Sequence, residues 1–389
     1  MLKVACGGMH TIVIAEGGLV YSWGVNDEGA LGRKADKNTP DAESKPGLVP
    51  MPSGVAPAVD VSTGDSHVAV ATSDGAVVAW GTFRTSSGLW AFTPDEQIAR
   101  SPVVVYTPVD SSGRARALAS GTDHVIALTA GGDVYSWGCG EKGRLGRLPE
   151  ADADNVSKRD DAAKRKLLTP SKVPNLPAGG VTAVAAGSYH SFGIAASPDG
   201  SKSDVFGWGL NSYGQLGMPY DFSMPASSQL VYFPKRVDEL CGRGVVAADG
   251  GEAHTVALAA SGKVYAFGRS AYGRLGLAGI DPKDDEPRSA MSEVAGVPGR
   301  ATAVVAGGSN SGAVTASGDA YLWGYGELGQ IGRGDDQSDA LTPERVVPTK
   351  NMKDTRVAAV SFGGQHAALL CVPADGGDAG GGHAAKRAR

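Results

Sequence analysis

Six histidines are the residues of this chain whose type and spacing could do chemistry. Each stands three positions after a glycine, in the pattern Gly-x-x-His, and the pattern occurs a seventh time with asparagine in place of histidine. The seven residues are His10, His67, His124, His190, His254, Asn310 and His366. Because imidazole nitrogens bind metals and transfer protons near neutral pH, such a set could form a metal site or an acid–base site.

The spacing of these residues indicates a structural repeat instead. Successive members are 57, 57, 66, 64, 56 and 56 residues apart, a register that a random sequence does not keep. A fixed period of this length is typical of tandem structural units. We therefore expect each histidine to hydrogen-bond the backbone of its own unit rather than a metal, and we expect no metal site and no cofactor.

Other signatures of chemistry are weak. Two G-x-G-x-x-G stretches, Gly138–Gly143 and Gly324–Gly329, open no helix, so we interpret both as turns rather than dinucleotide sites. The sequence shows no Ser-His-Asp set, so we expect no covalent enzyme chemistry. The four cysteines form no C-x-x-C pair, which argues against a zinc site or a disulfide framework and favours a reducing compartment. They are Cys6, Cys139, Cys241 and Cys371.

The elements that must position the histidines follow a second repeated motif. After each of the first six Gly-x-x-His or Gly-x-x-Asn motifs comes a short strand that ends in aromatic-glycine, and a Gly-x-Leu-Gly-like turn follows five of these. The aromatic positions are Trp23, Trp80, Trp137, Trp208, Phe267 and Trp323. One unit thus reads as an edge strand near a proline, a small apolar strand such as 181–186, the strand after histidine and the aromatic strand.

A four-stranded unit repeated seven times predicts an all-β, seven-bladed β-propeller. The 57 glycines fit a turn-rich chain, and the repeated tryptophans can pack between neighbouring sheets. We expect one propeller over 1–372 and a flexible, Gly-rich basic tail over 373–389. Seven Gly-x-x-His-type motifs against six aromatic strands predict incomplete first and last blades, as in a truncated chain.

Bulk charge narrows the class of partner. The chain carries 36 Lys and Arg against 41 Asp and Glu, a net charge of −5. Such a protein does not coat nucleic acid by overall charge, so any such contact must be local. The sequence has no signal peptide and no apolar run near 18 residues, so we expect neither secretion nor a membrane span. We expect a monomer.

Gly-x-x-His combined with Trp-Gly-x-x-x-x-Gly-x-Leu-Gly resembles the repeat of the regulator of chromosome condensation family. The stretches 26–33, 64–67, 138–141, 146–150 and 268–277 resemble the members that exchange guanine nucleotide on the small GTPase Ran. The resemblance covers about residues 4–372. It implies a nuclear, chromatin-associated exchange factor that acts on Ran without covalent chemistry.

The second unit departs from the repeat, because residues 82–90 replace the Gly-x-Leu-Gly turn. In the resembled family a β-hairpin here presses on the phosphate-binding region of the GTPase. The resemblance implies a protruding wedge that offers apolar area and backbone groups, and the alternative is a loop variant of one blade. The wedge residues are Phe83, Arg84, Thr85, Ser86, Ser87, Gly88, Leu89 and Trp90.

The variable positions of Gly-x-x-His should cluster on one rim, since every blade has the same orientation. The acidic or polar residues there are Asp65, Asp123, Glu252 and Gln365. By resemblance, Asp65 and Asp123 face Ran, and His254 belongs to the same GTPase-binding rim. An acidic rim would steer a basic partner surface toward it. A plain solvated rim is the alternative.

The largest insertion, at about 150–170, is rich in charge. The resembled family presents arginines here to the acidic patch of the nucleosome, which implies a chromatin-binding set; a solvated charge run is the alternative. The set is Lys158, Arg159, Lys164, Arg165 and Lys166. The last four residues, 386–389, could contact DNA phosphates or act as a nuclear signal.

Two departures from the family leave a second function open. The resembled exchange factors begin earlier, with a strand that carries an acidic contact residue, and they have a doubled histidine where Ala253 precedes His254 here. The alternative is therefore a propeller adaptor of the same family that binds proteins without exchange activity. For a photoreceptor of this repeat family we would expect tryptophans clustered on one face. Only Trp90 lies outside the aromatic position of the repeat, which argues against that function.

Overall fold

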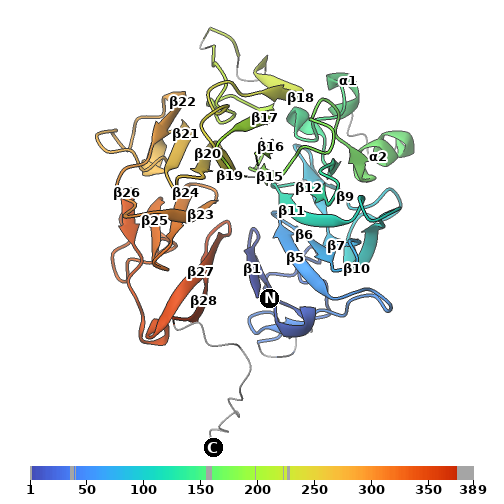
Figure 1. The fold of residues 1–389 in the computed structure, drawn as a ribbon. Coiled ribbons are helices and arrows are strands. Elements are labelled where there is room, and N and C mark those ends of the chain that lie inside the picture. The colour runs from blue at the N-terminus through green and yellow to red at the C-terminus, as the bar shows by residue number, and fades with distance from the viewer. Residues whose placement is uncertain are drawn as a thin grey trace, which may run out of the picture.

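The computed structural model describes residues 2–35, 39, 41–154, 160–197, 199–221, 223–225 and 228–374. They form six four-stranded antiparallel sheets and two two-stranded ones. The four-stranded sheets and one of the two-stranded sheets stand around a common axis (Figure 1). We number the four-stranded sheets one to six in chain order. The expected all-β propeller is confirmed.

In each four-stranded sheet, successive strands in the order of pairing lie farther and farther from the axis. The innermost strands are β1 (Lys3–Cys6), β5 (Ala58–Thr63), β11 (Ala115–Ser120), β15 (Ala183–Ala186), β19 (Val245–Gly250) and β23 (Ala301–Ala306). The second strands are β2 (His10–Ile14), β6 (His67–Thr72), β12 (His124–Thr129), β16 (His190–Ala196), β20 (His254–Ala259) and β24 (Asn310–Thr315).

The third strands carry the aromatic-glycine motif, and a fourth strand closes each sheet on its outer side. The third strands are β3 (Val20–Gly24), β7 (Val77–Gly81), β13 (Val134–Gly138), β17 (Ser203–Leu210), β21 (Val264–Arg269) and β25 (Ala320–Gly324). The outer strands are β4 (Gly47–Leu48), β10 (Ala99–Tyr106), β14 (Ser171–Lys172), β18 (Leu230–Arg236), β22 (Pro287–Glu293) and β26 (Ala340–Arg345).

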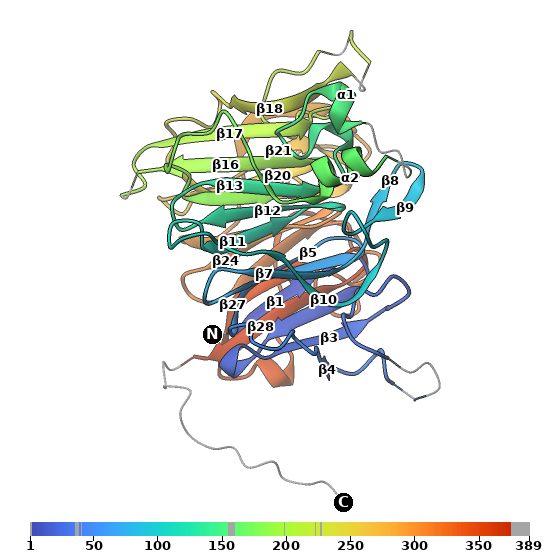
Figure 2. The ribbon, with the colours of Figure 1, turned by 90° about the vertical axis from the view of Figure 1, so that its right-hand side faces the viewer.

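Two strand pairs lie outside this scheme. The two-stranded sheet consists of β27 (Thr355–Phe362) and β28 (Ala367–Pro373), and it stands beside β1 in the ring (Figure 1). A hairpin of β8 (Phe83–Thr85) and β9 (Gly88–Ala91) projects from one end face of the ring (Figure 2). It interrupts the second sheet between β7 and β10.

The expectation of an incomplete first blade is wrong. The outer strand pairs with the aromatic strand that precedes it in the chain, as β3 pairs with β4. We had assigned each outer strand to the unit that follows it, which left the first unit one strand short. The last sheet has two strands among the described residues.

Five of the six aromatic residues are buried, as packing between neighbouring sheets requires, and Trp23 is half-buried. Trp80, Trp137, Trp208 and Trp323 are at most 1% exposed. Close packing against them requires glycine in the turn of the preceding sheet: a Cβ on Gly146, whose φ is +68°, would lie 2.6 Å from the ring of Trp208.

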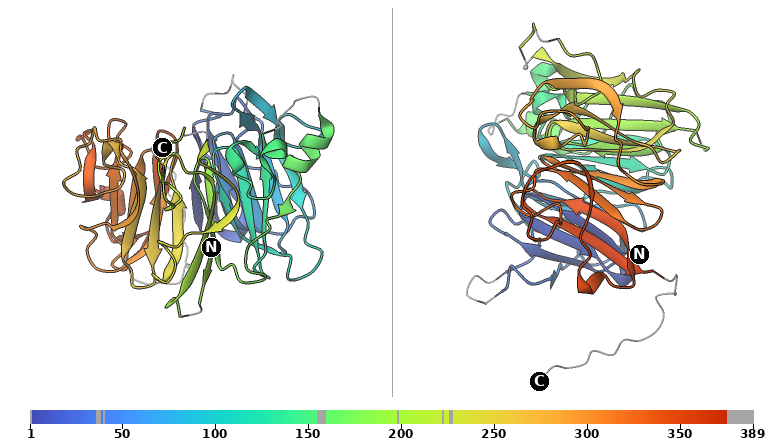
Figure 3. Two further views of the ribbon diagram at one scale, coloured as in Figure 1. Left: turned by 90° about the horizontal axis from the view of Figure 1, so that it is seen from above. Right: turned by 90° about the vertical axis from the view of Figure 1, so that its left-hand side faces the viewer.

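Helices are few and short. The insertion forms α1 (Glu150–Ala153) and α2 (Asp161–Leu168), which cover the outer side of the third sheet, and the 3-10 helices are Glu16–Gly18, Glu141–Gly143, Ala271–Gly273 and Lys350–Met352. In the part of the chain that the structure describes, no helix is both long and apolar enough to cross a membrane. Figure 3 shows the ring from two further sides.

Candidate functional site

A polar network between neighbouring sheets fixes the Gly-x-x-His turns. The Nε2 atom of His190 lies 2.9 Å from Oγ1 of Thr255. Thr255 is the residue after His254, the histidine of the next motif. Thr255 in turn donates to the carbonyl of Gln215, in the Gly-x-Leu-Gly turn. Since the hydroxyl proton is used there, His190 donates its Nε2 proton to Thr255. The same bond joins His124 to Ser191, His254 to Ser311 and His366 to Thr11.

These bonds correct the expectation that each histidine bonds backbone within its own blade. The partner is a hydroxyl of the next sheet, because the histidine ring points across the interface between the two sheets. Burial lowers the pKa of His190 to about 3 and of His10 to about 4, which keeps both rings neutral. The histidines therefore join the sheets to one another.

Two histidines lack this partner for a reason visible in the sequence. The residue after His67 is Val68, so no hydroxyl faces His10, and the residue after His124 is Val125, so none faces His67. The Nε2 atoms of both rings are buried without a hydrogen-bond partner among the described residues.

In the second sheet the hairpin replaces the Gly-x-Leu-Gly turn, which in other sheets bonds the tryptophan of the next sheet. In three interfaces the carbonyl of the second turn residue accepts a bond from the next tryptophan, as Arg144 does from Trp208 at 3.0 Å. The second sheet has the hairpin there instead, and Trp137 Nε1 is buried with no partner in the described part of the chain. Aromatic packing takes its place: the ring of Phe83 lies 4.7 Å from His67 and 5.2 Å from Phe92.

This packing corrects the expected wedge. Phe83 is fully buried and Trp90 is 2% exposed, so both lie at the base of the hairpin. They do not offer apolar area to a partner, because they fill the space that the missing turn leaves. The projecting part is the tip, 84–89, which is polar except for Leu89.

Asp123 supports the hairpin from below. It is 6% exposed, its Oδ1 accepts the amide of Arg84 at 2.6 Å, and its Oδ2 lies 3.7 Å from Nη1 of Arg144. Burial raises the pKa of this carboxyl to about 6, against the lowering effect of Arg144. We had expected a rim residue that faces the partner, but the hairpin covers it. His254 is also fully buried and does not reach the rim surface.

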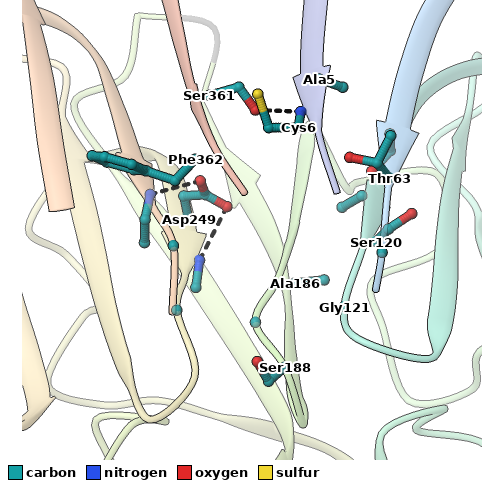
Figure 4. Close-up of a pocket in the computed structure, with 18 of the residues that line it drawn as sticks. Ala5, Cys6, Thr63, Ser120, Gly121, Ala186, Ser188, Asp249, Ser361 and Phe362 are labelled. Atoms are coloured by element: carbon teal, nitrogen blue, oxygen red, sulfur yellow. Dashed lines mark hydrogen bonds between the residues drawn. The ribbon is translucent and has the colours of Figure 1, made fainter. Parts of the chain in front are cut away.

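The other three rim residues are exposed. They are Asp65, Glu252 and Gln365. The first variable residue of each Gly-x-x-His or Gly-x-x-Asn turn lines one cavity of about 560 Å³ on the axis, so these turns surround one mouth of the ring. Figure 4 shows this cavity, whose walls are mostly small residues such as Ala186 and Ser120.

The sequence analysis missed a group of charged residues around the hairpin. Glu28 and Glu141, from the turns of the first and third sheets, bind Arg84 and Ser86 respectively. Lys142 lies 3.6 Å from the ring centre of Tyr189 on the same face. Their position in the turns on either side of residues 82–90 was the available signal.

The insertion places its described cations beside carboxylates. Arg165 is 65% exposed and lies 3.7 Å from Asp95, just beyond the hairpin. Lys166 pairs with Asp152 at 2.8 Å, and Lys164, with Asp161 at 3.5 Å, is 18% exposed. Lys158, Arg159 and the basic tail 386–389 lie outside the described residues.

Asp160, between the cations of the insertion, has a structural role. Its carboxylate accepts the amides of Ala162 and Ala163, each at 3.0 Å, and so caps the N-terminus of α2. On the inner side of α2, Leu167 and Leu168 are buried in the core. The helix is thereby held with Arg165 outward.

The fold and this face define the class of protein: a β-propeller of tandem repeats with an inserted hairpin on one end face of the ring. A family model described as RCC1-like domain matches residues 1–369, and the chain belongs to that family.

Relatives of the chain cover nearly all of it. It is 36% identical over 375 residues to the human regulator of chromosome condensation, covering 95% of this chain and 82% of that protein. It is 32% identical to guanine nucleotide exchange factor SRM1 of Saccharomyces cerevisiae, covering 94% of this chain and 78% of that protein. The crystal structure of Prp20p from S. cerevisiae, described with its binding to Gsp1p and histones, matches with a TM-score of 0.79 and 30% identity, over 95% of this chain and 82% of that one.

Proposed function

We propose that this protein is a guanine-nucleotide exchange factor for the small GTPase Ran. The observation that carries the proposal is the hairpin tip 84–89, which projects from the end face and is bonded to the sheets on both sides of it. The yeast relative named as a guanine nucleotide exchange factor supports the activity. The yeast structure described with Gsp1p supports a GTPase as the partner.

The mechanism needs no covalent bond to be made or broken in the protein. The face binds the nucleotide-free GTPase more tightly than the nucleotide-bound form, so the nucleotide and the factor weaken each other's binding reciprocally. The tip offers the hydroxyls of Thr85, Ser86 and Ser87 and backbone groups around Gly88. These groups compete with the phosphates for donors and acceptors in the GTPase. GTP binding then releases the factor.

The rim residues divide into two roles in this proposal. Asp65, Glu252 and Gln365 contact the GTPase directly, because they are exposed around the mouth of the ring. Two exposed carboxylates at one mouth attract a basic partner surface and speed its association. Asp123 and His254 act through the structure, since their side chains are buried.

We also propose that the insertion contacts chromatin and that the protein is nuclear. Arg165 and Lys166 are the exposed described cations of α2, and guanidinium groups bind carboxylates in two-point contacts. The partner would be the acidic patch of the nucleosome, with Lys158, Arg159, Lys164 and the tail contributing. The printed description of Prp20p, which mentions histones, supports this choice.

The two-stranded sheet is proposed as the seventh blade of one propeller domain, expected over 1–372 with 373–389 as a tail. Pro373 still belongs to β28, so the domain extends at least to that residue. Three contacts support a closed ring: the amide of Cys6 donates to Ser361 Oγ at 2.9 Å, His366 meets Thr11 at 2.9 Å, and the amide of Gly364 donates to the first Gly-x-x-His turn. Most residues of the tail, 375–389, lie outside the described part of the chain.

The direct test is release of a fluorescent GDP analogue from purified Ran with catalytic amounts of this protein. The proposal expects release to accelerate in proportion to the amount of protein added. Release at the uncatalysed rate, by a protein that folds and still binds Ran, would favour the adaptor alternative. The adaptor alternative is based partly on Ala253, which stands where the resembled exchange factors have a histidine. Ala253 is buried and puts no side chain on the rim.

A further inference from the structure

The hairpin tip has little structure of its own. Its two strands pair only with each other, over a few residues, and they join no blade. An isolated two-stranded hairpin is at best marginally stable in water. The buried Phe83 and Trp90 anchor the base, but the backbone from Arg84 to Leu89 leaves the core. Something else must hold the tip in one pose.

Glu28 holds the tip from the side of the first sheet. Its Oε2 accepts a bond from Nε of Arg84 at 3.0 Å, and its Oε1 pairs with Nη2 of the same guanidinium. A two-point pair of this kind fixes direction as well as distance. The Glu28 side chain is 18% exposed, so solvent screens the pair less than it would a fully exposed one.

Glu141 holds the tip from the side of the third sheet. Its Oε2 accepts the backbone amide of Ser86 at 2.9 Å, and its Oε1 accepts the Ser86 hydroxyl at 2.8 Å. Glu141 begins the 3-10 helix Glu141–Gly143, which leads into the turn whose Arg144 carbonyl accepts a bond from Trp208 of the fourth sheet. Glu141 therefore ties the end of the hairpin to a segment that is itself bonded to the next sheet.

We propose that Glu28 and Glu141 are positioning residues that hold the hairpin tip in the pose in which it meets the GTPase, an inference that rests on the proposed function. Both oxygens of each carboxylate already bind the hairpin. They therefore act through the tip, whereas Asp65 and Glu252 have exposed carboxylates for the partner. Asp123 completes the support at the base, where it accepts the amide of Arg84.

The test compares Glu28→Ala, Glu141→Ala and the double variant with the intact protein. Without the two carboxylates, a tip that holds the productive pose about a tenth of the time lowers kcat/KM for GDP release about tenfold. In the free protein, hydrogen–deuterium exchange of the amides of residues 84–89 should rise about tenfold in the double variant, because the tip opens locally. The melting temperature should stay close to that of the intact protein.

Two further variants separate positioning from other roles. Exchanging the charges, with Glu28→Arg and Arg84→Glu together, restores the ion pair and should recover most of the protection of residues 85–89 lost in Glu28→Ala. Glu293→Gln is the matched control: it breaks an exposed ion pair, with Lys263, on outer strand β22 and should change neither release nor hairpin protection.

The outcomes are distinguishable. A fall in release with unchanged protection of residues 84–89 would mean that the carboxylates touch the GTPase directly, and it would overturn the proposal. Unchanged release together with unchanged protection would also overturn it. If the intact protein itself does not accelerate release, the proposed function fails, and hydrogen–deuterium exchange alone still decides whether the two carboxylates hold the tip.

Discussion

At the scale of single residues, the inter-sheet bonds have a simple rule. A histidine donates to the hydroxyl that follows the next Gly-x-x-His motif, and that hydroxyl donates to a turn carbonyl. His254, Ser311 and Arg274 show all three parts, with bonds of 2.8 and 2.7 Å. The rule predicts which substitutions strengthen or weaken the ring.

Val68→Thr should stabilise the protein by about 1 kcal/mol, because a hydroxyl there can accept from His10 and donate to the carbonyl of Ala30. That carbonyl already accepts from Trp80, as the carbonyl of Arg274 does from Trp323. Urea denaturation of the purified variant measures the change in the free energy of unfolding.

The matched control is Thr255→Val, which removes the equivalent bond to His190. It should destabilise by about 1–3 kcal/mol, since the histidine donor is left buried without a partner. A Val68→Thr protein less stable than its parent would contradict the rule.

Because of Asp249, we expect the free energy of unfolding to depend on pH. Its two carboxylate oxygens accept the amides of Gly250 and, across the interface, Ala306 (Figure 4), and burial raises its pKa to about 7. The folded state binds this proton more tightly than the unfolded state. The contribution of Asp249 to stability is therefore greatest near pH 4 and is lost as the pH rises toward 7.

Asp249→Ser removes this dependence, because Ser361 shows that serine at the equivalent position accepts the same inter-sheet amide bond. The buried histidines have the opposite slope below pH 6.5, so the difference between variant and parent is the informative quantity. The variant should gain stability relative to its parent between pH 5 and pH 8 in denaturation curves. A difference that is flat with pH would refute this assignment.

At the scale of elements, the repeat was predictable and its interruption only in part. The motif spacing indicates where the second strands begin, since each of the first five histidines opens a second strand opposite a third-strand glycine, as His67 faces Gly81. The location of the hairpin followed from the lost Gly-x-Leu-Gly turn. The burial of Phe83 and Trp90 did not, because it depends on the space left beside Trp137 in the next sheet.

The fate of Asp123 could not be predicted for a similar reason. Gln365 occupies the same variable position in its own motif and is exposed. Asp123 is buried only because the hairpin of the neighbouring sheet lies over it and donates the Arg84 amide. A pattern within one repeat does not report what an adjacent, irregular repeat places on top of it.

The helix α2 carries the prediction for chromatin. Arg165→Glu with Lys166→Glu should weaken binding to reconstituted nucleosomes about tenfold, equivalent to about 1.4 kcal/mol, because two cations are replaced by anions opposite an acidic surface. Fluorescence polarisation with labelled nucleosomes measures the change, and release of GDP from free Ran in solution should not alter. Unchanged nucleosome affinity would assign the charges of α2 to the solvated surface of the protein.

At the scale of the whole molecule, the histidine–hydroxyl bond that links the third, fourth, fifth and sixth sheets also links the last sheet to the first. His366 bonds Thr11 as His190 bonds Thr255. The repeated turns form one end face of the ring, and the hairpin projects from that face (Figure 2). We therefore place the exchange activity at the hairpin, where the second sheet departs from the repeat.

The central claim is that the hairpin tip drives nucleotide release. The most direct measurement is the rate of GDP release from Ran under saturating protein, for the intact chain and for a variant in which only residues 84–89 are replaced by Gly and Ser. The buried anchors Phe83 and Trp90 are kept so that the core is unchanged. The account predicts that the variant still binds Ran but that its maximal release rate falls nearly to the uncatalysed rate. A variant that releases GDP as fast as the intact protein would contradict it.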